Sequence, residues 1–445
     1  MKTIQKSLTL LLVLVLTLPL CACTSAAAID QQAYAILAGI EYGTQNRYLV
    51  TIRLADVTAE ASQNSPNILS IEADTLGIAL TTLNTSFNQS INFGQLRYIF
   101  FSRDLAQSGD FMQLIQWMDI SPAFSPAAGI IICEGSAMQT IQAIKPLLGE
   151  RLSRGLTTLE MTMLKESYIP DTSLHRMAST MGSLYSTPLG IFCSLSQDTR
   201  QQGQGQEQSQ GQQSQQQDQQ QTRVGGEKEA QQSGSQESGR QSSPKPVISP
   251  APEQSAPLPS QPRDALGVVW GDQYAGELLH QGGNSVDLFG TAAFTRDRLG
   301  VILTGYESQL LGMATGEFES ANLTFSTDEG NMDIHLSNLK HIEGPHLSQT
   351  DEPAILLSIS LRGHLLSTQN PDIPALSRQI GQMIEQDLYR VLQTLYQAGC
   401  DPLGIGGSQA RRYLTIGEYE SAFIPETLQN VPIGVSVSLM LSGSV

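Results

Sequence analysis

Hydrophobic and polar positions alternate with two different periods along the chain, and these periods predict its strands and helices. Between Tyr48 and Leu54 the residues alternate as in a half-buried strand. The apolar run Ala35–Ile40 precedes it, and the polar segment 41–46 between the two predicts a hairpin. Further strands are expected at Leu96–Phe101 and Ala127–Cys133, with helices at Ile71–Phe87, Asp104–Met118 and Ala137–Leu148. This alternation of helices and strands favours a sheet covered by helices.

The C-terminal half begins with strands and continues with one long helix. Segments 290–294 and 299–303 flank a charged turn and predict a hairpin. Further strands are expected at 321–326, 331–339, 354–361 and 431–441. In 374–398 apolar residues recur at helical spacing after a proline, and Gly399 stands where this helix is expected to end. The whole pattern predicts an α+β fold of two to three domains, each a mostly antiparallel or mixed β-sheet with packed helices.

A low-complexity segment separates the two halves. Between Gln201 and Gln221 there are 14 Gln in 21 residues, and a Pro-rich stretch follows. Such a composition offers too little apolar surface to offset the entropy of ordering, so 196–265 is predicted to be a disordered linker between the regions 23–195 and 266–445. A self-associating Gln tract is the alternative, but this block has no aromatic residues, which favours a spacer.

The first residues carry the pattern of an export signal. Lys2 and Lys6 precede the apolar run Leu8–Leu20, as in a secretory signal peptide. A run of about 13 apolar residues is too short to cross a bilayer as a helix. Cys23 follows a small residue, as in the lipobox of bacterial lipoproteins, so residues 1–22 are expected to be cleaved and Cys23 to be the lipid-attachment site. The alternative is an ordinary signal peptide in which the cysteines are incidental.

The net charge narrows the range of partners. The chain has 42 Asp and Glu against 25 Lys and Arg, which gives a net charge of −17. Phosphate backbones and anionic lipid headgroups both repel such a chain, so no nucleic-acid partner is expected. Membrane attachment must then come from the acyl chains on Cys23 rather than from a basic surface.

Candidate metal and acid–base residues are few, and each has a structural interpretation. His335, His341 and His346 lie within twelve residues, but Gly344–Pro345 is expected to break the strand that carries them, so exposed histidines are favoured over a metal site. Two acidic pairs are predicted to be solvated surface: Glu385 with Asp387, and Glu418 with Glu420. No metal ligand or catalytic residue is therefore expected.

The remaining motifs also favour structural roles. The glycine-rich segment 404–407 before Arg411 and Arg412 offers an anion cradle in principle, but it follows a helix, which favours a helix-to-strand loop. Cys133, Cys193 and Cys400 are odd in number and widely spaced, which indicates no disulfide framework, and the first two are expected to be small buried hydrophobes. The chain also lacks the common hydrolase motifs.

The order of these segments resembles the Ger(x)C (GerAC-like) spore germination lipoproteins, the third subunit of nutrient germinant receptors in endospore-forming bacteria. The resemblance rests on Ala38–Glu41 before the strand at 48–54, on Ile91–Phe100 leading into Asp104–Ala106, on 290–294 with 297–300, on Asp401–Gly406 and on Arg411–Tyr413. Glu41, Gln95 and Tyr419 stand where members of that family usually carry Asp, His and Trp.

The resemblance implies a non-enzymatic receptor subunit in spore germination, without cofactor or catalytic residues. It implies partners, namely a permease-like membrane-embedded subunit and a second transmembrane subunit. It also implies a location at the outer face of the cytoplasmic (inner) membrane of the spore, anchored through acylated Cys23. The alternative is a solute-binding lipoprotein of a transporter, but that class requires two lobes around a cleft joined by short crossovers. A surface hydrolase is a third class, which the absence of motifs disfavours.

Overall fold

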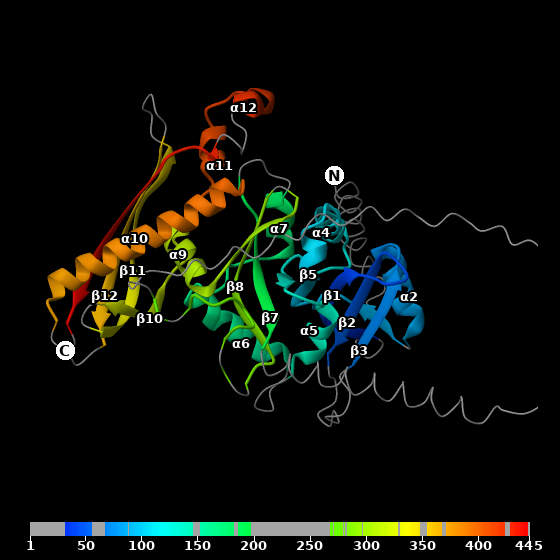
Figure 1. Cartoon of the computed structure of the whole chain (residues 1–445). Coiled ribbons are helices and arrows are strands. Elements are labelled where there is room, and N and C mark those ends of the chain that lie inside the picture. Colours follow the sequence, from blue (N-terminus) through cyan, green and yellow to red (C-terminus); the bar gives the residue numbers. More distant parts are fainter. Residues whose placement is uncertain are drawn as a thin grey trace, which may run out of the picture.

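A computed structural model of the chain (Figure 1) has two mixed sheets with packed helices. This architecture confirms the expected α+β class. The structure describes residues 32–55, 67–87, 89–145, 152–181, 186–196, 268–269, 271–278, 280, 283–295, 297–327, 330–347, 354–366, 371–422 and 428–443. The predicted signal peptide, Cys23 and all but the first residue of the predicted linker lie outside these ranges.

The larger sheet has parallel strands at its centre and antiparallel strands at both sides. Its order is β3 (Ile68–Ala73), β2 (Tyr48–Leu54), β1 (Gln32–Tyr42), β5 (Tyr98–Ser102), β6 (Gly129–Cys133), β7 (Leu189–Leu195), β8 (Val286–Phe294) and β9 (Leu299–Leu303), with β4 (Ser90–Asn92) beside β1. Strands β1, β5, β6 and β7 run parallel, and the outer pairs run antiparallel. Parallel strands are stable when both of their faces are covered.

Helices cover both faces of the larger sheet. Helices α2 (Leu76–Ser86), α4 (Asp110–Ile120) and α7 (Leu174–Met181) share a core with one face, whereas α5 (Ala137–Ala143) and α6 (Leu152–Lys165) share a core with the other. The short helix α3 (Arg103–Ala106) connects β5 to α4. Along β5 the side chains alternate between the two cores, with Phe100 in one and Phe101 in the other. Strand β5 is therefore buried on both faces. Strand β2, which was expected to be half-buried, is also buried along most of its length.

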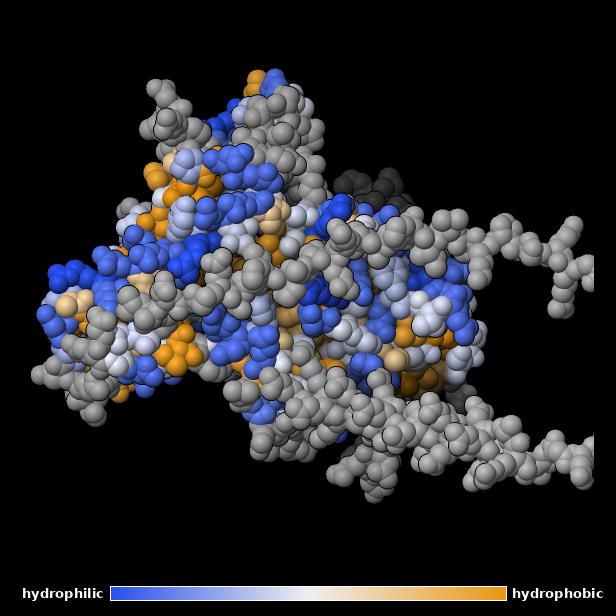
Figure 2. Space-filling model, in the orientation of Figure 1, coloured by the Kyte–Doolittle hydropathy of each residue, from blue (hydrophilic) through white to orange (hydrophobic). Residues whose placement is uncertain are grey.

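The second sheet carries the longest helix. It has the order β10 (Ser320–Thr327), β11 (Gly330–Leu347), β12 (Ile355–Leu365) and β13 (Ile433–Ser442), and β13 runs parallel to β12. Helix α10 (Ile373–Gln397) lies along β13, and α9 (Gly305–Thr315) connects the β8–β9 hairpin to this sheet. Helices α11 (Ile405–Ala410) and α12 (Ile416–Ala422) extend beyond the end of α10 (Figure 1). On the face in Figure 2, hydrophobic residues form small groups among hydrophilic ones.

Strands from both sides of the predicted linker lie in the larger sheet. Strand β7 precedes the linker and β8 follows it, and they pair antiparallel from Leu189 opposite Ala293 to Leu195 opposite Val286. The next strand, β9, extends the same sheet. The two halves of the chain therefore share a sheet and a core.

The first hairpin holds helix α5 at its N-terminal end. The Glu41 carboxylate at the end of β1 accepts the N–H groups of Ala137 and of Met138, the latter at 3.3 Å. Gly39, two residues earlier, allows α5 to lie close to the strand, because a Cβ there would fall 2.8 Å from Cδ1 of Ile141. The segment 38–41 that resembles the germination family thus packs and caps this helix.

The same hairpin holds the C-terminal end of α5. Arg53 on β2 is 5% exposed, and its Nη1 donates to the carbonyl oxygens of Ile141 (3.2 Å) and Ile144. An acid at the N-terminal end and a base at the C-terminal end both match the helix dipole.

The tip of this hairpin is fixed by two carboxylates from elsewhere in the chain. The Glu72 carboxylate on β3 accepts the backbone N–H groups of Thr44 (3.0 Å), Gln45 (2.7 Å) and Asn46 (2.9 Å). These hydrogen bonds, the one from Thr44 first, lower the pKa of Glu72 to about 2, because they stabilise the ionised carboxylate.

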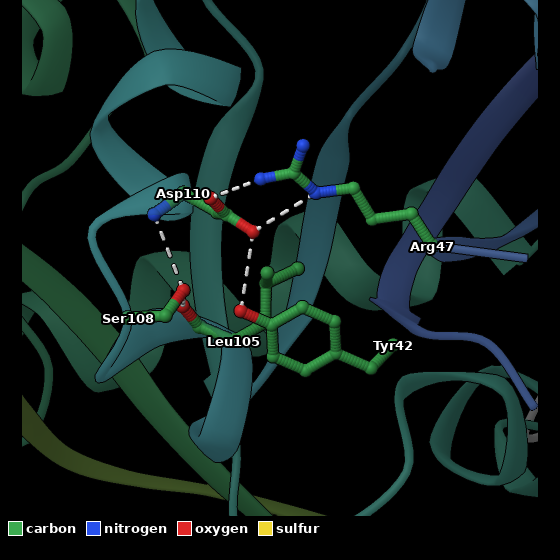
Figure 3. A network of polar contacts seen from close by, with 5 residues as sticks. All are labelled: Tyr42, Arg47, Leu105, Ser108 and Asp110. Atoms are coloured by element: carbon green, nitrogen blue, oxygen red, sulfur yellow. Dashed lines mark hydrogen bonds and ion pairs between the residues drawn. The ribbon is translucent and has the colours of Figure 1, made fainter. Parts of the chain in front are cut away.

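Asp110 holds the other side of the hairpin tip (Figure 3). It accepts two hydrogen bonds from Arg47, from Nη2 at 2.6 Å and from Nε at 3.3 Å, and a third from the hydroxyl of Tyr42 at 3.3 Å. Its own N–H donates to Ser108 Oγ at 3.3 Å. The start of α4 is thereby tied to the turn between β1 and β2.

Several expected bounds are wrong. The helix expected at 137–148 ends already at Ala143, and three other differences have a local reason. The expected helix 71–87 begins as strand β3, and α2 starts only after Thr75, whose Oγ1 accepts the N–H of Ile78 at 3.2 Å. The expected helix 104–118 is divided into α3 and α4, where Ser108 Oγ donates to the Leu105 carbonyl at 2.7 Å. Strand β11 was expected to end before Gly344–Pro345, but it continues through these residues. Shifts of register in its pairing with β12 accommodate the proline.

Replacing Glu72 with Gln should make the free energy of unfolding depend less on pH in the acid range. Because the folded pKa of Glu72 is below its ordinary value of 4.5, its contribution is present above about pH 4.5 and is lost as the pH falls towards 2. Urea unfolding should therefore show Glu72→Gln less stable than the wild type at pH 7, with the difference shrinking towards pH 3. Asp74→Asn, an exposed neighbour, is the control. A difference that stays constant with pH would contradict this assignment.

Cutting the chain within the predicted linker should leave its two halves associated. A protease site inserted between Gln221 and Thr222 allows cleavage of the folded protein, with the uncut protein as the control. Because β7 and β8 are neighbours in one sheet, the fragments should elute together in size-exclusion chromatography and separate only in denaturant. Separate elution in native buffer would show that the shared sheet does not hold the halves together.

Candidate functional site at the junction of the two sheets

A groove lies where the two halves of the chain meet. One compartment, of about 500 Å³, is bounded by α6, the segment that follows it and α9. A second, of about 440 Å³, is bounded by α7, the start of β7 and residues 402–404. Asp171, Leu189, Thr315 and Glu317 line both compartments, so the two adjoin.

Arg176 on α7 bridges the two sides of this groove. Its Nη1 lies 3.0 Å from Oδ2 of Asp171, and its Nη2 lies 3.1 Å from Oε1 of Glu317, just beyond α9. All three side chains are 40% or more exposed, so each ion pair contributes at most about 1 kcal/mol to stability. The pairs position the rim of the groove more than they stabilise the fold.

The wall of the larger compartment contains a buried polar group with an unmet hydrogen bond. Ser167 is 5% exposed, and its Oγ has no hydrogen-bond partner among the described residues. Its φ of 55° lies in the left-handed region, which a serine adopts at a cost. An unsatisfied buried hydroxyl lowers the stability of the folded protein by about 1–3 kcal/mol more. The chain therefore keeps an unfavourable residue at this wall.

Helix α9 meets Ser167 through a glycine. The helix starts with a capping box, in which Thr304 and Glu307 satisfy each other's backbone N–H groups. At Gly312 a Cβ would lie 2.7 Å from Cβ of Ser167 and 2.8 Å from its Oγ. Gln309, on the same helix, donates from Nε2 to the carbonyl of Glu166 at 2.9 Å. The absent side chain at position 312 thus lets the segment after α6 approach α9.

The glycine-rich segment after α10 binds a carboxylate of its own chain. Asp401, 8% exposed, accepts the N–H groups of Ile405 (3.0 Å) and Gly406 (2.7 Å) and the hydroxyl of Tyr396 (3.1 Å). Burial raises the pKa of Asp401, and these hydrogen bonds oppose the rise. The amides that offered an anion cradle in principle are thus engaged within the protein. The expected helix-to-strand loop is wrong in one respect, because residues 405–407 begin the short helix α11.

His335 and His346 lie eleven positions apart along β11. His335 contacts Asn322 through Nδ1 at 2.8 Å, His346 is exposed, and the side chain of His341 lies outside the described ones. In the part of the chain that the structure describes, no group of three His, Cys, Asp or Glu residues is placed to hold a metal ion.

The acidic pairs differ from the expected solvated surface in one respect. Asp387 is 7% exposed, because it faces α9 and accepts the hydroxyl of Tyr306 on that helix at 3.4 Å. It also pairs with Arg390, one turn later on α10, at 3.3 Å. The prediction that Asp387 is exposed is therefore wrong. Glu385 accepts the N–H of Val437 at 3.0 Å. Glu418 is exposed, as expected, whereas the side chain of Glu420 lies outside the described ones.

The cysteines are buried, as the sequence predicted for two of them. Cys133 on β6 and Cys193 on β7 are partners in register with their sulfur atoms 3.5 Å apart, and neither is in a disulfide. Burial raises the pKa of the Cys193 thiol, and burial followed by the nearby Asp401 raises the pKa of Cys400 to about 12. Such thiols remain protonated and unreactive.

The expected lipid-attachment site, Cys23, lies outside the described residues. No helix within the described ranges combines the length and the hydrophobicity that crossing a bilayer requires.

The fold and the groove define an α+β protein with two sheets, in which both halves of the chain contribute strands to the larger sheet. Comparison with known families gives its membership. The model described as "Spore germination protein N-terminal domain" matches residues 25–189, and the model described as "Spore germination B3/ GerAC like, C-terminal" matches residues 289–444. The chain belongs to the GerAC-like family of spore germination proteins, the C-subunit family of germinant receptors.

A solved structure described as "Crystal Structure of the GerBC protein" is similar, with 10% sequence identity and a TM-score of 0.45 over 91% of this chain and 96% of that chain. No curated protein matches the sequence.

Replacing Gly312 with Ala should destabilise the junction. The added methyl group meets Ser167 at 2.7 Å, so we expect a loss of about 1–3 kcal/mol in the free energy of unfolding. Gly155→Ala on α6 is the matched control, because nothing lies within 4 Å of its Cβ and the helix should gain up to about 1 kcal/mol. Chemical denaturation measures both variants, and equal stability for the two would contradict the close approach of α9 to Ser167.

Proposed function

We propose that this chain is a lipid-anchored, non-enzymatic subunit of a nutrient germinant receptor. In this proposal, acylated Cys23 holds it at the outer face of the inner membrane of the spore, where it binds a permease-like subunit and a second transmembrane subunit. The observation that carries the proposal is that both family regions, 25–189 and 289–444, match in the family's order directly after a lipobox at 20–23.

A lipid anchor suits a protein of this charge. With a net charge of −17, the chain is repelled by anionic headgroups, so acyl chains rather than a basic patch must provide the attachment. Anchoring also confines the protein to the plane of the membrane and raises its effective concentration near membrane-embedded partners. Weak contacts between subunits then suffice for assembly.

The shared sheet disfavours the solute-binding alternative. Such proteins close two lobes around a ligand by hinge motion. Here β7 and β8 pair in one sheet and contribute to one core, so the two halves of the chain cannot open about the linker without breaking that pairing.

Replacing Cys23 with Ala should release the protein from the membrane. Because the thiol that accepts the lipid is lost, we expect the protein to move from the membrane fraction to the soluble fraction of spore lysates. Nutrient-triggered germination should fail, while germination by routes that bypass the receptor stays intact. Cys21→Ala is the matched control, since Cys21 follows Leu20 and is the poorer acceptor.

Membrane retention of the Cys23→Ala protein would contradict the anchoring. In the control strain, affinity purification from detergent-solubilised spore membranes should recover both membrane-embedded subunits. Recovery of neither would count against the receptor assignment, even if the anchoring were confirmed.

A further inference from the structure

We propose that the larger compartment of the junction groove binds a small organic ammonium ion with an apolar body. The inference rests on the composition of this compartment and does not depend on the receptor assignment. Three features carry it: an apolar lining, an excess of carboxylates and a buried hydroxyl with an unmet hydrogen bond.

The lining provides space and apolar contact. Leu164 and Ile169 come from α6 and the segment after it, and Leu189 and Leu311 come from β7 and α9. A volume of about 500 Å³ is within the range of small-molecule sites, which are mostly apolar with a few polar groups. An aryl or alkyl body of eight or so carbon atoms would displace water from these side chains.

The charged groups favour a cation. Asp171, Glu317 and Glu319 line the compartment, against one base, Lys165. Arg176 pairs with the first two acids, whereas Glu319 forms no ion pair among the residues that the structure describes. An ammonium group at the rim would therefore meet a carboxylate that forms no ion pair with the described cations.

Ser167 provides the third feature, which is independent of the other two. It is 95% buried and lines the compartment, and its hydroxyl oxygen lacks a partner within the described residues. Buried polar groups are almost always hydrogen-bonded, and an exception calls for a reason. An N–H donor of a ligand would satisfy this oxygen, which accounts for a serine at a position where it costs stability in the free protein.

The test compares three probes of similar size that differ in charge: 2-phenylethylamine, 2-phenylethanol and 3-phenylpropionate. Each is titrated into the purified full chain in detergent by isothermal calorimetry. The amine should bind saturably with a dissociation constant of the order of 1 mM, as ligand efficiency allows for so small a molecule, and about tenfold more tightly than the alcohol. Equal binding of amine and alcohol, preference for the carboxylate or no binding of the amine would each overturn the proposal.

Two variants locate the binding. Glu319→Gln should weaken binding of the amine about fivefold without changing binding of the alcohol. Asp104→Asn, an exposed acid on α3, removes the same charge elsewhere and should change neither. An unchanged affinity in Glu319→Gln would overturn the assignment of the ammonium group to this rim.

Ser167→Ala separates a ligand role from a structural one. Because it removes an unsatisfied hydroxyl, it should leave the free protein at least as stable in thermal unfolding, and it should weaken binding of the amine several-fold. Retained affinity for the amine in this stable variant would show that Ser167 takes no part in binding and would overturn the proposal as stated.

Discussion

The antiparallel pairing of β7 with β8 is the interaction on which the rest of this structure depends. It brings residues from both sides of the predicted linker into adjacent strands, and it places α9, which follows β9, against the segment after α6. The cost of closing a loop grows only with the logarithm of its length, by about 0.6 kcal/mol for each doubling. A long Gln-rich segment between the two strands therefore adds little to the free-energy cost of closing the loop, as long as β7 and β8 stay paired.

Close approach through glycine recurs at two places where a helix packs against the larger sheet or its connections. Gly39 admits α5 to β1, and Gly312 admits the Ser167 segment to α9. The surroundings differ in their polar chemistry. At α5, Glu41 accepts backbone N–H groups at one end of the helix and Arg53 donates to backbone carbonyl groups at the other. At α9 the approach leaves Ser167 unsatisfied. The contact of α5 with β1 is typical of structural packing. At α9, the unsatisfied hydroxyl of Ser167 lowers stability, and packing alone does not explain why a serine is present there.

The sequence predicted those elements whose hydrophobic period is strong. Strands β2 and β9 and the long helix α10 were expected at or near their observed bounds. Strand β9 and helix α10 each have one buried and one more exposed side, and β2 shows alternating polarity in its sequence although it is mostly buried. Helix α9 was not expected, since almost all of its residues are buried and no polar face marks the helical period. Helices α6 and α7 and strand β7 were also missed, and with them the segment that forms the groove. The groove combines residues more than 100 positions apart, which no local pattern links.

The position of the groove gives a ligand there a structural effect. One wall comes from the segment after α6, before the linker, and the other from α9, after it. The surface ion pairs of Arg176 that join these sides contribute little to stability, because their charges are well solvated. A ligand that contacts both walls would stabilise the folded junction in proportion to the logarithm of its concentration over its dissociation constant. The groove has weak ion pairs at its rim and an unsatisfied Ser167 hydroxyl in its wall. In a germination protein, a small molecule bound there would change the stability of the chain without any chemical step.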